Sequence, residues 1–383
     1  MAKLFGTPEL YHGVGSLGEL KNIKGKKAVI VIGGSSVVKN GSLQKVAALL
    51  DEAGLQHTVF SGVEADPSIE TARRGATLFM EFQPDWVIGL GGCSAIDAAK
   101  AMWALYEHPE LTFETMTQIG GIPPLRNKAR FIAIPSTSGT GTEITALAVI
   151  TDRTNNVKYP LVSYELLPDI SIVDGVLCKS MPADVTANTG LDALTHCVEA
   201  YVSNIDDNYA DAFAKGGIEL IFNNLKQAIA DPQNETVRQN MHDASCLGGY
   251  AFTNAWLGIA HSMAHQIGGT FGIPHGCANA IVLPSVIRYN AAVTGRYADL
   301  ARLLGKSTSE EFATAIEVLR TEVNVAPSVK ACGIEQETWD QEVKRMAEHA
   351  MSDPCTGFNP RKLKLEEMER LFMAVYEGVR VNF

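Results

Sequence analysis

Short apolar runs that end near glycine alternate with segments of helical periodicity between residues 26 and 135, and this alternation is the strongest constraint on the fold. The run KKAVIVIGG (26–34) indicates a strand, and the segment after it places Leu43, Val46 and Leu50 at helical spacing. Three further runs, HTVFSG, DWVIGLGG and RFIAIPSTSGTGTE, repeat the pattern. Strands that alternate with helices predict a parallel sheet with helices on both faces.

The strand signals stop after DISIVDGVLCKSMPADVTANTG (169–190), and later stretches such as NYADAFAKGGIELIFNNLKQAIA carry helical periodicity. A chain of 383 residues is also long for a single core. We therefore expect two domains: an α/β domain over residues 1–180 and an all-helical domain over residues 181–383.

Composition narrows the function classes. The formal net charge of -11 argues against nucleic acid or an anionic membrane as a partner. The seven cysteines are scattered and form no C-x-x-C pair, which fits a reducing compartment. The N-terminal segment lacks the apolar core of a signal peptide, and no run of about 18 apolar residues occurs. We expect a cytoplasmic protein.

The first candidate site is a glycine turn, GLGGCSAIDAAK (89–100), where a strand runs into a helix N-terminus. Free backbone N–H groups and the helix dipole suit such a turn to phosphate, although many glycine turns only let a strand meet a helix. The glycines at 33 and 34 and the loop STSGTGT (136–142) also follow strands. Ligands of open α/β sheets bind at the carboxyl ends of strands. The pattern predicts a Rossmann-like nucleotide-binding domain.

The second candidate site lies in the helical half. Asp192 and His196 are four residues apart, so in a helix they share one face. The segment GIAHSMAHQIGGTFGIPHGCANA adds His261, His265 and His275. These could be hydrogen-bonded core histidines and a first-turn carboxylate. Alternatively, they bind a metal, and a donor set of carboxylate and imidazoles suits Fe(II) or Zn(II).

Six motifs together resemble the iron-containing, or group III, alcohol dehydrogenase family: GLGGCSAIDAAK, IPSTSGTGTE, GLDALTHCVEAY, GIAHSMAHQIGG, IPHGCANAIVLP and SDPCTGFNPR. The resemblance covers essentially the whole chain. It implies a metal site with ligands Asp192, His196, His261 and His275. It also implies that His265 lies near the metal as a catalytic residue that relays protons.

The resemblance also implies a set of dinucleotide contacts: Gly91, Gly92, Ser94, Asp97, Thr137, Thr140 and Lys158. Phe252 and Cys355 match positions near the substrate pocket of the family. One position departs from the family pattern, because Cys93 stands where the family usually has a third glycine. A side chain therefore stands at this position of the turn, where the family pattern has none.

The resemblance implies a metal-dependent alcohol dehydrogenase or aldehyde reductase that transfers hydride between a nicotinamide dinucleotide and a small alcohol or aldehyde. We expect NADP(H), with NAD(H) as the alternative, because no acid lies between Val31 and Gln44. The turn instead offers small and hydroxyl-bearing residues: Gly33, Gly34, Ser35 and Ser36. We expect Fe(II), with Zn(II) as the alternative, and a homodimer or higher homo-oligomer.

Two other functions remain open on the sequence. A metal-dependent lyase or hydrolase of the related dehydroquinate synthase type would also join a nucleotide-binding domain to a helical metal domain. In a non-catalytic protein, the metal would only stabilise the fold.

Overall fold

The computed structural model describes residues 3–118, 120–154 and 157–383, and its contacts divide the chain into two compact units. The first unit comprises residues 1–137, 141–180 and 233–246, and the second comprises residues 138–140, 181–232 and 247–383. Helix α8 (Glu235–Ala255) therefore contributes to both units.

The units differ from a simple division at residue 180 because the first part of α8 is tied to a strand end of the first unit. The Gln239 side chain donates to the Val173 carbonyl at 3.0 Å and accepts from the Gly175 N–H at 2.8 Å. Helical periodicity alone could not show to which unit these residues belong.

A parallel sheet forms the first unit, and among the described residues its six strands lie in the order β1-β8-β5-β4-β2-β3. The strands are β1 (Glu9–His12), β2 (Lys27–Gly33), β3 (Gln56–Val63), β4 (Trp86–Gly91), β5 (Arg130–Pro135) and β8 (Ile170–Val173). Strand β4 pairs with β2, although β3 lies between them in sequence. The strand order therefore reverses between β2 and β4, which is where ligands bind in open α/β sheets.

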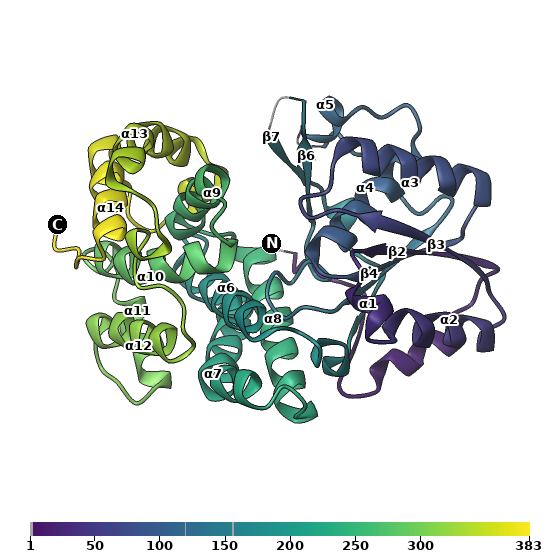
Figure 1. Ribbon diagram of the computed structural model, residues 1–383, viewed down its shortest axis with the longest axis horizontal. Helices are drawn as coiled ribbons and strands as arrows, with labels where there is room; N and C mark the ends of the chain where they lie inside the picture. The colour runs from purple at the N-terminus through teal and green to yellow at the C-terminus, as the bar shows by residue number, and fades with distance from the viewer. Residues whose placement is uncertain (1–2, 119, 155–156) are drawn as a thin grey trace. The chain divides into compact units, whose positions relative to one another are not determined.

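Both faces of this sheet are covered. Strand β2 is buried along its length, with Val29 and Val31 in one hydrophobic cluster and Ile30 and Ile32 in the other. Figure 1 shows α3 and α4 over one face and α1 and α2 over the other. Besides part of α8, the α-helices of this unit are α1 (Ser36–Lys39), α2 (Ser42–Glu52), α3 (Ile69–Phe82), α4 (Cys93–Glu107) and α5 (Phe113–Met116). The predicted two-sided parallel sheet is confirmed.

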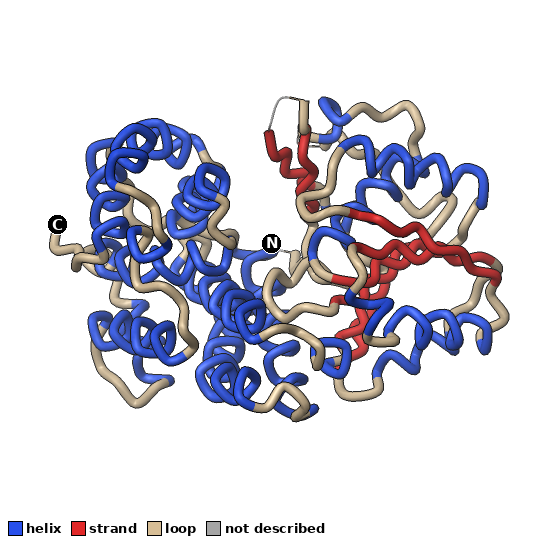
Figure 2. Tube along the Cα trace, viewed as in Figure 1, coloured by secondary structure: helices blue, strands red, loops and turns tan. Residues whose placement is uncertain are grey.

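Two features of this unit went beyond the sequence prediction. Strands β6 (Leu147–Asp152) and β7 (Val157–Val162) form an antiparallel pair apart from the main sheet (Figure 2). The edge strand β1 was also missed, because it is only four residues long and carries polar residues at both ends. Its place depends on pairing with the distant β8, which local patterns do not reveal.

The second unit is helical, as predicted, and Figure 2 shows its helices without strands among the described residues. Besides part of α8, its helices are α6 (Ala183–Val202), α7 (Asn208–Ala230), α9 (Ile259–Phe271), α10 (His275–Asn290), α11 (Arg296–Leu303), α12 (Ser309–Glu322), α13 (Gln336–Ser352) and α14 (Leu365–Glu377). In the described part of the chain, no helix combines the length and apolar character needed to cross a bilayer.

Candidate active site

Helix α6 contributes the first pair of predicted metal ligands. Asp192 and His196 lie one turn apart, and both side chains are buried. The next helix to reach them is α10, which begins at His275. A Cβ at Gly276 would lie 2.0 Å from the Asn188 carbonyl oxygen, so only glycine permits so close an approach of α10 to α6. As a result, His275 Nε2 lies 3.5 Å from Asp192 Oδ1.

Glu199 positions the third element, helix α9. Its carboxylate accepts from the Ala260 N–H at 2.7 Å and lies 2.6 Å from His261 Nδ1. The first N–H groups of a helix have no partner within the helix, so a buried carboxylate there is stabilising. We assign the His261 proton to Nδ1 from this hydrogen bond, which leaves Nε2 as the ligating atom.

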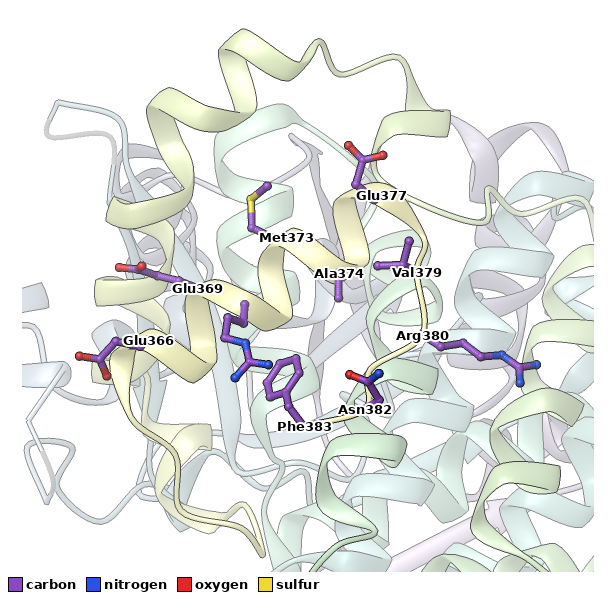
Figure 3. A pocket seen from close by; sticks show the side chains of 10 residues that line it. Glu366, Glu369, Met373, Ala374, Glu377, Val379, Arg380, Asn382 and Phe383 are labelled. Atoms are coloured by element: carbon purple, nitrogen blue, oxygen red, sulfur yellow. The ribbon is translucent and has the colours of Figure 1, made fainter.

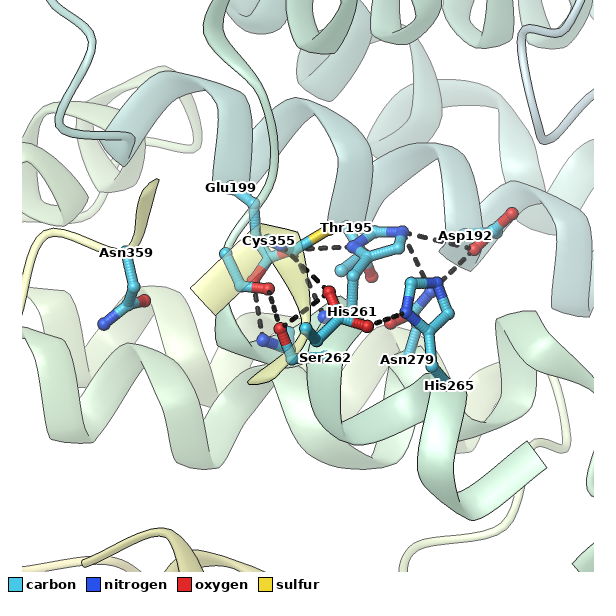
Figure 4. Close-up of polar contacts among 12 residues, drawn as sticks. Asp192, Thr195, Glu199, His261, Ser262, His265, Asn279, Cys355 and Asn359 are labelled. Atoms are coloured by element: carbon cyan, nitrogen blue, oxygen red, sulfur yellow. Dashed lines mark hydrogen bonds and ion pairs between the residues drawn. The ribbon is translucent and has the colours of Figure 1, made fainter. Parts of the chain in front are cut away.

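These helices bring three of the four predicted ligands together. Among the described residues, one ligand atom each from Asp192, His261 and His275 lie within 4.8 Å of one another. Asn279, one turn after His275, reaches into the same place (Figure 4). Its Nδ2 lies 2.8 Å from Asp192 Oδ1 and 3.2 Å from Nε2 of both histidines.

His196, the fourth predicted ligand, lies beside this group. Its ring stacks on that of His261, with centroids 4.7 Å apart. Within the described residues, His196 Nδ1 and Asn279 Oδ1 are buried and have no hydrogen-bond partner. Buried polar atoms are rarely left unsatisfied, and the donor set of one carboxylate and imidazoles suits Fe(II) or Zn(II). The residues present therefore fit a divalent metal ion.

The protonation of the cluster also suits a cation. Burial, together with the neighbouring His196 and His275, lowers the pKa of His261 well below its usual value, so its ring is neutral near pH 7. Burial alone would raise the pKa of Asp192, but the adjacent imidazoles outweigh it and lower that pKa. Burial raises the pKa of Glu199 to about 7, although the backbone N–H groups of α9 favour its ionised form.

His265 has different surroundings from the other histidines. Its Nδ1 lies 2.8 Å from Asp353 Oδ2, its side chain is 42% exposed, and its ring stacks on His275 with centroids 5.4 Å apart. Burial would raise the pKa of Asp353, but the hydrogen bond with His265 helps to lower it to about 2. An ionised Asp353 therefore accepts the Nδ1–H and leaves Nε2 as the ring atom of His265 that can exchange a proton.

In the first unit, the glycine turns after β2 and β4 lie together. Gly91 has a φ of 146°, which favours glycine. A Cβ there would lie 4.0 Å from the backbone nitrogen of Gly33. The loop after β5 joins them, because the Ser136 N–H donates to the Gly91 carbonyl at 2.8 Å. A Cβ at Gly92 would also lie 3.5 Å from Thr137 Cγ2. Gly33, Gly91, Gly92 and Thr137 thus meet where the strand order reverses.

The remaining predicted dinucleotide contacts differ in their exposure and in their partners. Gly34 and Ser35 are exposed in the turn between β2 and α1, Ser36 is exposed at the start of α1, and Ser94 is half-buried in the first turn of α4. The exposed Lys158 on β7 forms an ion pair with Asp66 at 2.8 Å.

Four further predicted positions differ in their surroundings. Asp97 is buried and hydrogen-bonded to the chain around residues 142–149. Thr140 belongs to the second unit. In that unit, the ring centroids of Phe252 and His196 lie 4.7 Å apart, and Cys355 lies in the short 3-10 helix Pro354–Phe358.

A surface pocket of about 590 Å³ lies elsewhere, along α14 and the C-terminal segment (Figure 3). Its lining includes Glu366, Arg370, Glu377 and Phe383, which belong to none of the motifs described above. Because the metal-type donors and the glycine turns lie outside it, we do not take this pocket as the active site.

Comparison with known proteins agrees with this geometry. A family model described as iron-containing alcohol dehydrogenase matches residues 7–175. A second, described as the C-terminal part of the Fe-containing alcohol dehydrogenase family, matches residues 186–376. The chain belongs to the iron-containing alcohol dehydrogenase family.

Its relatives in this alcohol dehydrogenase family align along most of its length. The NADPH-dependent butanol dehydrogenase of Clostridium saccharobutylicum is 47% identical over 382 residues, covering 98% of each chain. The 1,3-propanediol dehydrogenase of Klebsiella pneumoniae is 37% identical and covers 92% of each chain. An aldehyde-alcohol dehydrogenase of Streptococcus pneumoniae is 38% identical, and the match spans only 45% of that longer protein.

The structure of the iron-containing alcohol dehydrogenase of Thermococcus thioreducens superposes with a TM-score of 0.91 at 33% identity, covering 98% of this chain and 100% of that one. The expected family, the fold class and the assignment as an alcohol dehydrogenase of this type are confirmed.

Sequence reasoning missed three residues of this alcohol dehydrogenase site: Glu199, Asn279 and Asp353. Asn279 had a local signal, since it follows His275 by one helical turn. Glu199 and Asp353 lie within two of the motifs, but no local spacing pairs them with a histidine, because each meets one that is more than sixty residues away in sequence.

Proposed function

We propose that this protein interconverts small primary alcohols and aldehydes with NADP(H), using a divalent metal ion. The observation that carries the proposal is the convergence of Asp192, His261 and His275 within 4.8 Å, in a chain of this family. The glycine turns of the first unit supply the second requirement, a place for a dinucleotide.

Asp192, His196, His261 and His275 would hold the ion, with Fe(II) expected and Zn(II) as the alternative. When bound, the ion supplies a Lewis acid for the substrate oxygen, and the dinucleotide supplies the hydride chemistry. Glu199 fixes the His261 ring through Nδ1, which keeps Nε2 unprotonated and directed at the other ligands. Asn279 donates to Asp192 and orients its carboxylate.

His265 is proposed to move the proton that alcohol oxidation releases. Asp353 holds the Nδ1 side of the ring, so the proton is exchanged at Nε2. Partial exposure of the His265 side chain gives water access to that ring.

Preference for NADP(H) is proposed from the turn after β2. Gly34, Ser35 and Ser36 are exposed, and Lys39 follows in the last turn of α1. The turn carries hydroxyl groups and a cation suited to a 2′-phosphate, and it lacks the carboxylate that would repel one. The 47% identical relative whose name includes NADPH supports the same choice.

The test is a steady-state survey of the purified enzyme, reconstituted with Fe(II) or Zn(II). Absorbance of the reduced nicotinamide would be followed with butanal and propanal, using NADPH and NADH in parallel, and with 1,3-propanediol, using NADP+ and NAD+ in parallel. We expect metal-dependent turnover and a higher kcat/KM with NADPH. Absence of turnover with every metal and substrate would refute the proposed reaction, and a better kcat/KM with NADH would refute the cofactor choice.

A further inference from the structure

A fully buried lysine lies in helix α4, two turns from the glycine turn. Lys100 Nζ donates to three backbone carbonyls, those of Thr142 at 2.7 Å, Thr145 at 2.8 Å and Leu147 at 2.9 Å. These carbonyls lie on the segment that runs from Thr142, the last residue of the loop 136–142, to Leu147, the first residue of β6. The segment therefore wraps around a single ammonium group.

Asp97, one turn earlier on α4, binds the same segment through its negatively charged carboxylate. Its Oδ1 accepts from Thr142 Oγ1 at 2.7 Å, and its Oδ2 accepts from the Val149 N–H at 2.9 Å. The side chain is only 4% exposed. Each carboxylate oxygen thus accepts a hydrogen bond from the chain itself.

These contacts anchor one end of the loop 136–142, and the glycine turn anchors the other. At the start of the loop, the Ser136 N–H donates to the Gly91 carbonyl. At its end, Thr142 is held by both Asp97 and Lys100. Because Gly91 and Gly92 form the turn that leads into α4, and Asp97 and Lys100 lie on α4, the same helix fixes both ends of the loop relative to the glycine turn.

A buried ammonium is costly, and packing alone does not require one. Burial lowers the pKa of Lys100 to about 8, with Asp97 opposing that shift. An apolar side chain of similar length would fill the space without the desolvation penalty. The ammonium group adds directional hydrogen bonds to three carbonyls, which a hydrocarbon chain cannot form.

We propose that Asp97 and Lys100 are positioning residues that set the loop 136–142 against the glycine turn for dinucleotide binding. Asp97 acts through Thr142 and does not itself contact the dinucleotide. This inference rests on the proposed role of the loop and the glycine turn in binding NADP(H).

The test removes the hydrogen bond from Thr142 to Asp97 and keeps both buried charges, because removal of a charge, as in Lys100→Met, would also disturb folding. Thr142→Val deletes the hydroxyl that donates to Asp97 and keeps the side-chain shape. Thr151→Val is the matched control: Thr151 is a buried threonine of β6, and among the described residues its hydroxyl has no partner. Thr142→Ser keeps the hydroxyl and should rescue the loss. NADPH binding would be titrated by its fluorescence, with kcat, metal content and Tm measured on each variant.

We expect Thr142→Val to raise the Kd for NADPH by about 3- to 10-fold, part of the effect of a full hydrogen bond to a charged group. Its metal content should be unchanged and its kcat within about twofold of the parent, because Thr142 lies outside the metal cluster. Thr151→Val and Thr142→Ser should bind NADPH like the parent.

Equal Kd values for Thr142→Val and Thr151→Val would overturn the inference, as would failure of Thr142→Ser to restore binding. If the parent protein itself does not bind NADPH, the proposed function fails, which is a distinct outcome.

Discussion

Replacement of Glu199 by glutamine should weaken metal binding without touching a metal ligand. The Glu199 carboxylate accepts from the Ala260 N–H, the His261 N–H and His261 Nδ1. Glutamine has one acceptor oxygen and one NH₂ group, so in either orientation an NH₂ faces an N–H donor. When the NH₂ faces His261, it favours the tautomer with the proton on Nε2, which cannot ligate.

Two magnitudes follow from this geometry. One buried donor left without an acceptor costs about 1–3 kcal/mol, so we expect the free energy of unfolding to fall by about 2 kcal/mol. Loss of a hydrogen bond that orients a ligand typically lowers metal affinity by about 10- to 100-fold. We expect a loss in that range for Glu199→Gln.

The assay is a competition titration of Zn(II) against a chromophoric chelator, with urea unfolding measured in parallel. Glu107→Gln is the matched control, because Glu107 is also buried and also accepts from three backbone N–H groups, those of Asn127, Lys128 and Ala129. It should lose comparable stability and keep the metal affinity of the parent. The reasoning is refuted if Glu199→Gln binds Zn(II) as tightly as Glu107→Gln does.

Three other variants test separate parts of the account. His265→Ala should keep its metal while kcat falls about 10²-fold, through loss of proton transfer, and elemental analysis showing metal loss would contradict this role. Ser35→Asp should lower kcat/KM for NADPH by about tenfold or more and spare NADH, and an unchanged ratio would contradict a phosphate-binding turn. Position 34 is less suitable for this test, because its φ of 38° would strain any residue other than glycine. Burial lowers the pKa of His242 from 6.5 to about 4, so below pH 6.5 the unfolded chain binds a proton that the folded one does not. Stability should therefore fall between pH 6.5 and 4 by up to about 3 kcal/mol more in the parent than in His242→Asn. Urea unfolding with the same pH dependence in both would show that His242 does not titrate in this way.

The central strands were predictable because their signals are local. The runs that start at residues 26, 57, 85 and 130 became β2, β3, β4 and β5 with shifts of a residue or so at their ends. A buried parallel strand needs a continuous apolar run, and β2, β4 and β5 each have one, whereas β3 is an edge strand with only a short apolar stretch. The β6–β7 pair was missed because Lys158 and Pro160 interrupt its second strand.

The residues of the site were likewise predictable where their signals are local and not where they depend on tertiary packing. Spacing along one helix predicted the pairing of Asp192 with His196, and the family motifs supplied His261 and His275. The approach of α10 to α6 at Gly276, which brings His275 to Asp192, depends on tertiary packing. The same holds for the carboxylates of Glu199 and Asp353, whose histidine partners are set by how the helices pack.

The central claim is that the cluster on α6, α9 and α10 binds the metal used in catalysis. Elemental analysis of the purified protein and of His261→Ala, with His265→Ala as the control, tests it most directly. The account predicts about one divalent ion per chain in the parent and in His265→Ala, and loss of both metal and turnover in His261→Ala. Metal retained at the parent level in a folded His261→Ala protein would contradict it.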